Sequence, residues 1–429
     1  MEELDYQTLV EKHIYYKGHE YFNALDNLCF LSKNLYNATL YAVRQHYFNT
    51  GKYLNYYDVQ RKFQEENSVD YRALPAKVAQ HTIKLVHSSF LSFFSLLQLK
   101  KKGKYEEKVR IPRYLDKTAG RQTLFYTNQA ISLKRREGYI NLSGTDIFIK
   151  SDRKDIQFVQ ISSGSNSVSV NIGYRVELPE KKNLNEPRKF ASIDIGVDNL
   201  ATLTFEDKEP IIINGRPLKS INQYYNKVNA ELKSQQGENR KATNKMKSLS
   251  RKRSNKIRDY LHKSSRYIVN QLVSNNITDL VIGHTKDWKQ DANMGKVNNQ
   301  NFVSIPFNDF IFMLKYKCAL VGIEVHIIEE SYTSKASFLD RDKIPTYSKK
   351  RKNPPTFSGY RKSRGIYRSK KLGKEINADV NGSLNILRKF CKKNKINIEF
   401  NDLICTSYPK RIFIGFSFKC SSERLYQTE

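Results

Sequence analysis

The chain has 429 residues, of which 39% are hydrophobic and 12% aromatic, so it is long enough for two or three domains and too apolar for a disordered tail protein. Its 74 Lys and Arg residues against 43 Asp and Glu give a formal net charge of +31 at pH 7, which points to a polyanionic partner, above all nucleic acid. No apolar run approaches the length of a transmembrane span and the N-terminus MEELDY is unlike a signal peptide, so we expect no membrane association and a cytoplasmic, nucleoid-associated protein.

The first part of the chain, to about residue 105, has apolar residues at helical spacing. The pattern predicts one helix in FNALDNLCFLSKNLYNATLYAVRQHYF and another in LPAKVAQHTIKLVHSSFLSFFSLLQL. From there to about residue 185, short alternating runs such as IQFVQIS and VSVNIGYRVEL predict antiparallel strands. We therefore expect helices combined with a small β-barrel or sheet, followed by a polar linker from Pro179 to Lys189.

A different pattern begins at Phe190. The runs FASIDIGVDNLATLTF and EPIIING predict three consecutive strands, and a long helical stretch follows. Then come the strand DLVIG, the helix PFNDFIFMLKYKCALVG, the strand EVHIIEE and the helix NADVNGSLNILRKF. Three strands followed by alternating helices and strands predict a ribonuclease H-like α/β domain.

Two aspartates in this second part are candidate metal ligands. Asp194 is flanked by Ile193 and Ile195 on an apolar strand, where a carboxylate needs a cation, an Arg or a metal as its partner; a strand-closing turn is the alternative. Asp379 stands at the start of the last helix, where it could also be a simple cap. If the two meet at the top of the sheet, they could hold the divalent ions of a phosphodiesterase. Oxygen ligands favour Mg²⁺ or Mn²⁺.

Five motifs together resemble TnpB, the family of transposon-encoded RNA-guided DNA nucleases related to miniature type V CRISPR effectors and Fanzor. They are SIDIGVDNLAT, ADVNGSLNIL, LYNATLYAVRQ, YRALPAKVAQHT and YTNQAISL, and the resemblance runs from about residue 25 to 390. It implies a RuvC-type nuclease domain behind an N-terminal wedge and a helical recognition region. Asp194 matches the first RuvC aspartate and Asp379 the last.

The third acid of the family is a glutamate that usually follows the fourth strand, where this chain has Gly283 and His284. In a subset of the family it follows the neighbouring strand instead, and Glu330 matches that position with Glu329 as its rival. The two strands are parallel neighbours about 5 Å apart, and alternation allows only one of the two glutamates to point into the site. We predict a rearranged site with Asp194, Glu330 and Asp379 as catalytic and metal-binding residues. His284 is expected near the surface or behind the site.

Two basic runs predict nucleic-acid surfaces. Residues 240–263 carry ten Lys and Arg and one acid, too much like charge for a simple solvated helix face. Residues 341–374 form a basic insert in the nuclease domain, where the family usually has a zinc ribbon; Ala336 and Leu339 stand where thiols would be, so zinc is not expected. A basic loop without fixed structure is the alternative there. The predicted nucleic-acid-binding residues are Lys245, Arg251, Arg253, Lys256, Arg258, Lys350, Arg351, Arg361 and Arg364.

These features predict an α+β multidomain protein. Residues 1–185 would form the β-barrel or wedge with its helical recognition insert, residues 186–335 and 375–392 the RuvC-like nuclease domain, residues 336–374 the basic insert and residues 393–429 a tail. We expect a monomer that binds a guide RNA derived from the transposon end and cleaves target double-stranded DNA with two metal ions. The alternatives are a nuclease-inactive RNA-guided DNA-binding repressor and a miniature type V CRISPR effector.

Overall fold

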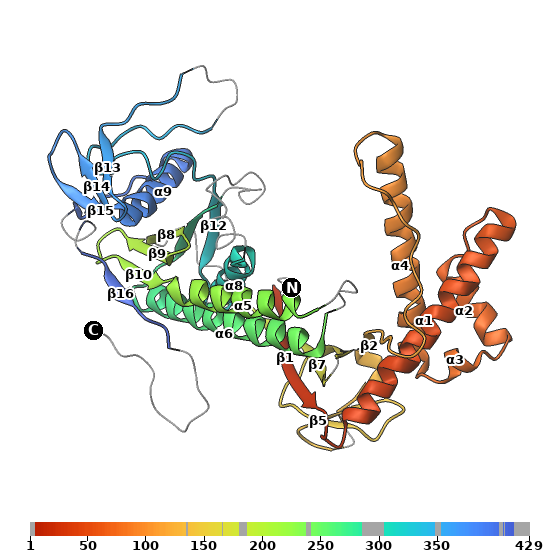
Figure 1. The fold of residues 1–429 in the computed structure, drawn as a ribbon. Helices are drawn as coiled ribbons and strands as arrows, with labels where there is room; N and C mark the ends of the chain where they lie inside the picture. The colour runs from red at the N-terminus through yellow and green to blue at the C-terminus, as the bar shows by residue number, and fades with distance from the viewer. Residues whose placement is uncertain are drawn as a thin grey trace. The chain divides into compact units, whose positions relative to one another are not determined.

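In the computed structural model the chain divides into two compact units, Met1–Glu177 and Leu178–Glu429. The structure describes residues 5–133, 136–164, 166–179, 187–236, 242–284, 304–347, 353–402, 406 and 408–415. Most of the expected linker and nearly half of the expected terminal tail lie outside these ranges. Figure 1 shows the fold.

The first unit joins long helices to antiparallel sheets. Its helices are α1 (Phe22–Thr50), α2 (Tyr56–Glu65), α3 (Val69–Arg72), α4 (Ala76–Lys101) and the 3-10 helix η1 (Asn128–Ala130). Its strands are β1 (Tyr6–Tyr16), β2 (Leu124–Thr127), β3 (Ile131–Ser132), β4 (Tyr139–Leu142), β5 (Phe148–Lys150), β6 (Ile156–Ser163) and β7 (Ser167–Glu177). One sheet has the order β1-β7-β6-β2 and the other β3-β4-β5, all antiparallel. The expected helices and antiparallel strands of this part are confirmed.

The core of the first unit forms where α1 and α4 pack against the larger sheet. Leu25 and Leu35 of α1, Val78 and Ile83 of α4 and Val159 of β6 are all buried in it. Helical spacing of three and four residues places these apolar side chains on one face of each helix, so that both helices bury an apolar stripe.

Helix α4 bears on the expectation that no segment could span a membrane. Among the described residues it is the one helix that is long and apolar enough, by length and composition, to cross a membrane. Serines interrupt its apolar residues, so the helix contains no long continuous apolar run although its mean hydropathy is high. The finding is weak evidence of a membrane span, because the core helix of a soluble protein passes the same test and α4 buries Val78, Val86 and Phe90 in the first unit's core.

The second unit is built on one large mixed sheet. Its strands are β8 (Phe190–Ile195), β9 (Asn199–Phe205), β10 (Ile211–Asn214), β11 (Asp279–Gly283), β12 (Glu324–Ile328) and β16 (Lys410–Ile412), in the order β12-β11-β8-β9-β10-β16. β8, β9 and β10 are antiparallel neighbours, whereas β11 runs parallel to both β8 and β12. β16 lies parallel to β10 and adds an edge strand from the segment expected as a tail.

Helices cover both faces of this sheet (Figure 1). They are α5 (Arg216–Ser234), α6 (Asn244–Ser274), α8 (Phe307–Ala319) and α9 (Ala378–Asn394). Ile193 and Ile282 pack with α6 and α8, whereas Phe190 and Val281 pack with Ile386 of α9. Because successive residues of a strand point to opposite faces, Asp194 lies on the face of β8 that α9 covers.

The basic insert has its own small core. Its strands β13 (Gly359–Ser363) and β14 (Ile366–Ser369) form an antiparallel sheet with β15 (Glu375–Asn377), which lies just beyond the expected boundary at residue 374. Phe338, Tyr367 and Ile376 are buried together with Leu384 of α9. The carbonyl oxygen of Ala336 accepts hydrogen bonds from two asparagine side chains of α9, so apolar and amide contacts hold this segment to the helix.

Candidate functional site

Asp194 stands near the carboxyl end of β8 and faces the start of α9. Ser192, two residues earlier on the same face, donates a hydrogen bond to the carbonyl oxygen of Ser383, at 2.7 Å. This contact holds α9 against β8 at short range. A Cβ on Gly382 would lie 2.6 Å from Oδ2 of Asp194, so the helix reaches the carboxylate only because residue 382 is glycine.

Asp379 belongs to the first turn of α9. The side chain of Asn377 caps this helix and accepts hydrogen bonds from the backbone N–H groups of Asp379 and Val380, which leaves the carboxylate of Asp379 free for other partners. Its Oδ2 accepts a hydrogen bond of 2.6 Å from Asn199, and its Oδ1 lies 3.5 Å from an Arg361 guanidinium nitrogen.

Glu330 follows the end of β12 and lies beside Gly283, at the end of β11. A Cβ on Gly283 would lie 3.2 Å from Oε2 of Glu330 and 2.4 Å from Ile386, so there is no room for a side chain at residue 283. Glu329 has a different environment: its carboxylate accepts hydrogen bonds from Lys389, at 2.6 Å, and from the backbone N–H of Ser331. Of the two glutamates, it is Glu330 that lies beside Gly283 and interacts with Asp194.

Three carboxylates lie near enough to one another for their charges to interact. Burial raises the pKa of Asp194 well above its usual value, and the charges of Glu330 and Asp379 raise it further. Burial also raises the pKa of Glu330 to about 7, with Glu329 adding to the effect. Carboxylates that repel one another in a partly buried place are stabilised by a cation, which makes this trio a candidate metal site.

A cavity of about 420 Å³ opens beside two of these acids, and arginines line it. Arg361 faces Asp379, and Arg364 forms an ion pair with Asp198. Two further arginines that no motif indicated, Arg216 and Arg411, line the same cavity from α5 and β16, as does Asn199. Only the pairing of β16 with β10 brings Arg411 to this place, and so its position could not be found in the sequence.

A second acidic cluster lies at the opposite end of β11. Ligand atoms of Asp279, Glu324 and His326 lie within 4.8 Å of one another, so among the described residues this group could hold a metal ion. Arg188 already neutralises it, with an ion pair to Asp279 and a nitrogen 3.4 Å from Glu324. Although burial acts to raise the pKa of Asp279, hydrogen bonds from His326, Arg188 and Thr278 hold it at about 2. The internal cation makes this cluster a closed network of ion pairs.

The residues of the predicted basic surface on α6 differ in exposure and in their contacts. Lys245, Lys256 and Arg258 are exposed, and Arg251 is partly buried. Arg253 instead donates hydrogen bonds to the side chain of Asn222 and the carbonyl oxygen of Ser304, so it serves the packing of α6. Lys350 and Arg351 lie outside the described residues.

Sequence comparisons match both halves of the second unit to known families. Residues 173–289 match the OrfB_IS605 family, described as a probable transposase, and residues 307–386 match the Cas12f1-like TNB domain. Over 413 residues the chain is 22% identical to the TnpB-like protein ORF457 of Acidianus two-tailed virus, covering 85% of this chain and 83% of that protein.

Solved structures of similar length include a Cas12f1–sgRNA–target DNA complex, with 14% identity, a TM-score of 0.34 and coverage of 88% of this chain and 98% of that one. The mini-RNA-guided endonuclease CRISPR-Cas_phi3 is 10% identical, with a TM-score of 0.42 and coverage of 90% and 92%. These TM-scores are below 0.5, so the assignment rests on the sequence matches. The two family matches, one after the other along the second unit, and the relative that spans most of the chain together support a TnpB-family protein.

Proposed function

We propose that the protein is a transposon-encoded, RNA-guided DNA endonuclease that hydrolyses phosphodiester bonds at a RuvC-like site. The observation that carries this proposal is the convergence of Asp194, Glu330 and Asp379, which come from three distant parts of the chain. A strand end, a loop and a helix start meet at one edge of the sheet, which is where α/β folds place their functional groups. A protein that only bound DNA would gain nothing from three carboxylates that repel one another and the DNA.

The strand order supports a ribonuclease H-like assignment. In chain order, the first five strands of the second unit's sheet lie as 3-2-1-4-5, with the first three antiparallel and the fourth and fifth parallel to the first. Three consecutive strands followed by alternating helices and strands were expected from the sequence, and this order fits the proposed nuclease domain of residues 186–335 and 375–392, with residues 336–374 as its insert. The larger sheet and helices of the first unit fit the proposed wedge and recognition region of residues 1–185.

The residues fit a site for Mg²⁺ or Mn²⁺. Carboxylate oxygens are the donors that these hard cations prefer, and the mutual repulsion of the trio favours a divalent ion. When bound, such ions supply an activated water and stabilise the leaving oxygen of a phosphodiester. Asp194, Glu330 and Asp379 would hold them, while Asn199 and the cap at Asn377 orient Asp379.

Arginines around the cavity support binding of a nucleic-acid strand beside the acids. Arg361 and Arg364 come from the insert, and Arg216 and Arg411 from the main sheet and its helix. Guanidinium groups bind phosphate oxygens in a bidentate manner, so they suit a strand placed for cleavage. Exposed Lys245, Lys256 and Arg258 on α6 offer a further backbone contact, for a guide RNA paired with target DNA.

We propose a cytoplasmic monomer.

An assay with the full chain, its co-purified RNA and a plasmid library tests the proposal. Cutting at sites complementary to the RNA, dependent on Mg²⁺ or Mn²⁺ and removed by chelation, is the expected result. RNA-dependent binding to DNA without cutting at any divalent metal would instead support the repressor. A gene beside a CRISPR array and not a transposon end would support the CRISPR effector.

A further inference from the structure

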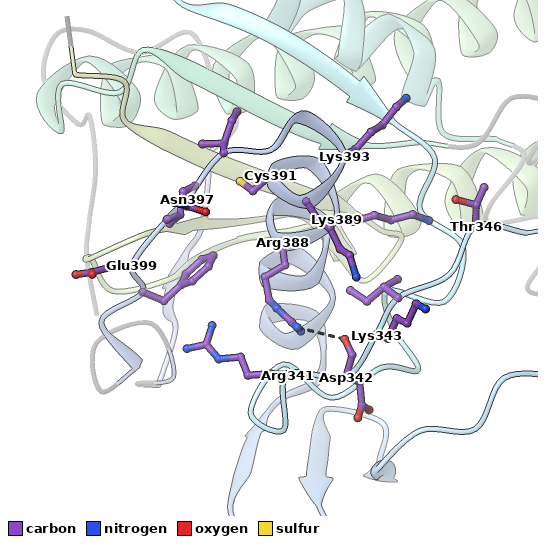
Figure 2. A pocket seen from close by; sticks show the side chains of 15 residues that line it. Arg341, Asp342, Lys343, Thr346, Arg388, Lys389, Cys391, Lys393, Asn397 and Glu399 are labelled. Carbon is purple, nitrogen blue, oxygen red and sulfur yellow. Dashed lines mark hydrogen bonds between the residues drawn. The ribbon is translucent and has the colours of Figure 1, made fainter.

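A pocket of about 800 Å³ lies beside the last turns of α9 (Figure 2). None of the residues that line it lines the acidic cavity. Its walls come from residues 341–346, from the end of α9 and from the segment 396–400 that follows the helix. Asp379 and Arg388 are nine positions apart on α9, which places the pocket roughly 14 Å along the helix from the acids. No residue of the acidic trio lines it.

Positive charge dominates this α9 pocket. Six cationic side chains line it against two acidic ones, Asp342 and Glu399. The Asp342 carboxylate is already bound, because it accepts hydrogen bonds from the backbone N–H groups of Ser337 and Ser358 and from the Ser358 hydroxyl. The cations are Arg341, Lys343, Arg388, Lys389, Lys392 and Lys393.

Arg388 is the most informative of these cations. Its guanidinium donates to the carbonyl oxygen of Asp342, as Figure 2 shows, and to the side chain of Asn385. Both acceptors are neutral, and Arg388 forms no ion pair with a described residue. Burial, with Arg341 nearby, lowers its pKa to about 10. A half-buried cation with only neutral hydrogen-bond partners is stabilised by an anion from outside.

The pocket also offers planar groups for stacking. The guanidinium carbon of Arg341 lies 4.9 Å from the ring centre of Phe338 and 5.5 Å from that of Phe400. Its ion pair with Asp402 is exposed, and such pairs are worth at most about 1 kcal/mol, so Arg341 can take another partner at little cost. Proteins that bind RNA place unstacked bases on aromatic rings and on guanidinium planes.

We propose that the α9 pocket binds an unpaired nucleotide of the partner RNA, with the phosphate on Arg388 and the neighbouring lysines and the base beside Arg341 and Phe400. The inference rests on the proposed function, because it takes RNA as the partner. A duplex backbone is convex and meets a groove or flat surface, whereas a pocket of this size suits an extruded nucleotide. The pocket would therefore hold a part of the RNA that is not paired with the target.

The test compares two charge reversals in the full chain. Lys392→Glu with Lys393→Glu changes two exposed pocket lysines, and Lys208→Glu with Lys227→Glu makes the same change at exposed lysines elsewhere in the second unit. The RNA that co-purifies with the wild type is transcribed with a fluorescent label, and its affinity is measured by anisotropy at several salt concentrations. We expect the pocket variant to lose about tenfold or more in affinity, with a salt slope smaller by about 1.4, because each contact to single-stranded phosphate contributes about 0.7. The control variant should lose about threefold or less.

The remaining outcomes overturn the inference. Equal losses of RNA affinity in both variants would mean that only the overall positive charge of the protein matters. A loss of affinity confined to labelled target DNA would mean that the pocket binds DNA. If adenosine monophosphate protects the wild type against thermal unfolding but not the pocket variant, while RNA affinity stays equal, the ligand is a free nucleotide. If no RNA co-purifies with the wild type, the proposed function itself is contradicted. If the wild type binds RNA and cuts DNA but the pocket variant has the same RNA affinity as the wild type, only this inference is contradicted.

Discussion

Oδ2 of Asp194 lies 2.6 Å from the place that a Cβ on Gly382 would occupy, so the acidic site depends on the absence of a side chain at residue 382. The contact is made with the tip of a side chain, which can rotate away. We therefore expect Gly382→Ala to change the free energy of unfolding by less than about 1–2 kcal/mol, since alanine's higher helix propensity offsets part of the crowding. Cleavage should fall about 100-fold, because a shift of about 1 Å in a catalytic group costs that much.

Plasmid cleavage rates and thermal unfolding measure the two effects of Gly382→Ala. Gly415→Ala is the control, because a Cβ there meets no atom within 4 Å. Full activity in Gly382→Ala would show that Asp194 need not hold its present position.

Glu330 and Glu329 should differ sharply when each is changed to glutamine. Glu330 adds to the charge around Asp194, whereas Glu329 binds Lys389 at 2.6 Å. We expect Glu330→Gln to lower cleavage by more than about 100-fold, since even the outer partners of metal ligands contribute 10- to 100-fold. Glu329→Gln should keep most of the activity and lose on the order of 1–3 kcal/mol of stability, because Lys389 loses its carboxylate.

Cleavage assays at saturating Mg²⁺ and denaturant unfolding distinguish these two glutamine variants. If Glu329→Gln abolishes cutting and Glu330→Gln does not, the assignment of the third acid is wrong.

On α6, Arg253 should affect stability whereas Lys256 and Arg258 should affect nucleic-acid binding. Arg253 donates to Asn222 at 2.7 Å and to Ser304 at 3.1 Å. Arg253→Ala should therefore cost about 1–3 kcal/mol. Lys256→Ala and Arg258→Ala, both at exposed positions, should change stability by less than about 0.5 kcal/mol and weaken RNA binding with a smaller salt slope. Unfolding curves measure the stability of each variant, and anisotropy titrations measure its RNA affinity. Unchanged RNA affinity in both exposed variants would show that α6 is not part of the binding surface.

Buried Lys317 gives the protein a stability that rises with pH. Burial, with Arg266 nearby, lowers its pKa from 10.5 to about 8, while its ammonium donates to the carbonyl oxygen of His262 and the hydroxyl of Ser265. Between pH 8 and 10.5 the folded protein has released this proton while the unfolded chain still holds it. The free energy of unfolding therefore rises across that window, by roughly 3 kcal/mol at 1.4 kcal/mol per pKa unit.

Lys317→Met should abolish this contribution, so the difference in stability between wild type and variant should shift by roughly 3 kcal/mol in favour of the wild type from pH 8 to 10.5. Denaturant unfolding at both ends of the window measures it, and the difference between the two proteins removes the other groups that titrate there. A difference that does not change with pH would show that Lys317 stays charged in the fold.

Much of this architecture follows from the order of residues along the chain. The runs around Asp194, Val281 and Val325 carry enough β-branched residues to predict their strands, and the helix that begins at Ala378 follows from its apolar spacing. The periods of 2 and 3.6 residues that separate strand from helix are local properties, so one sequence suffices to find them. Asp194 was a candidate because a lone carboxylate on an apolar strand needs a partner, whereas Asp379, at a helix start, became one only as its distant counterpart.

Tertiary structure alone decided which groups share the acidic site. The sequence left Glu329 and Glu330 as alternatives, and the packing of Lys389 on Glu329 and of Glu330 beside Gly283 separates them. Arg411 lies in a strand of three residues, too short for any periodicity, and reaches the acidic cavity only through pairing with β10. Neighbours along the chain determine a residue's local conformation, whereas contacts between residues a hundred or more positions apart depend on how whole faces pack, and that information is spread over the entire chain.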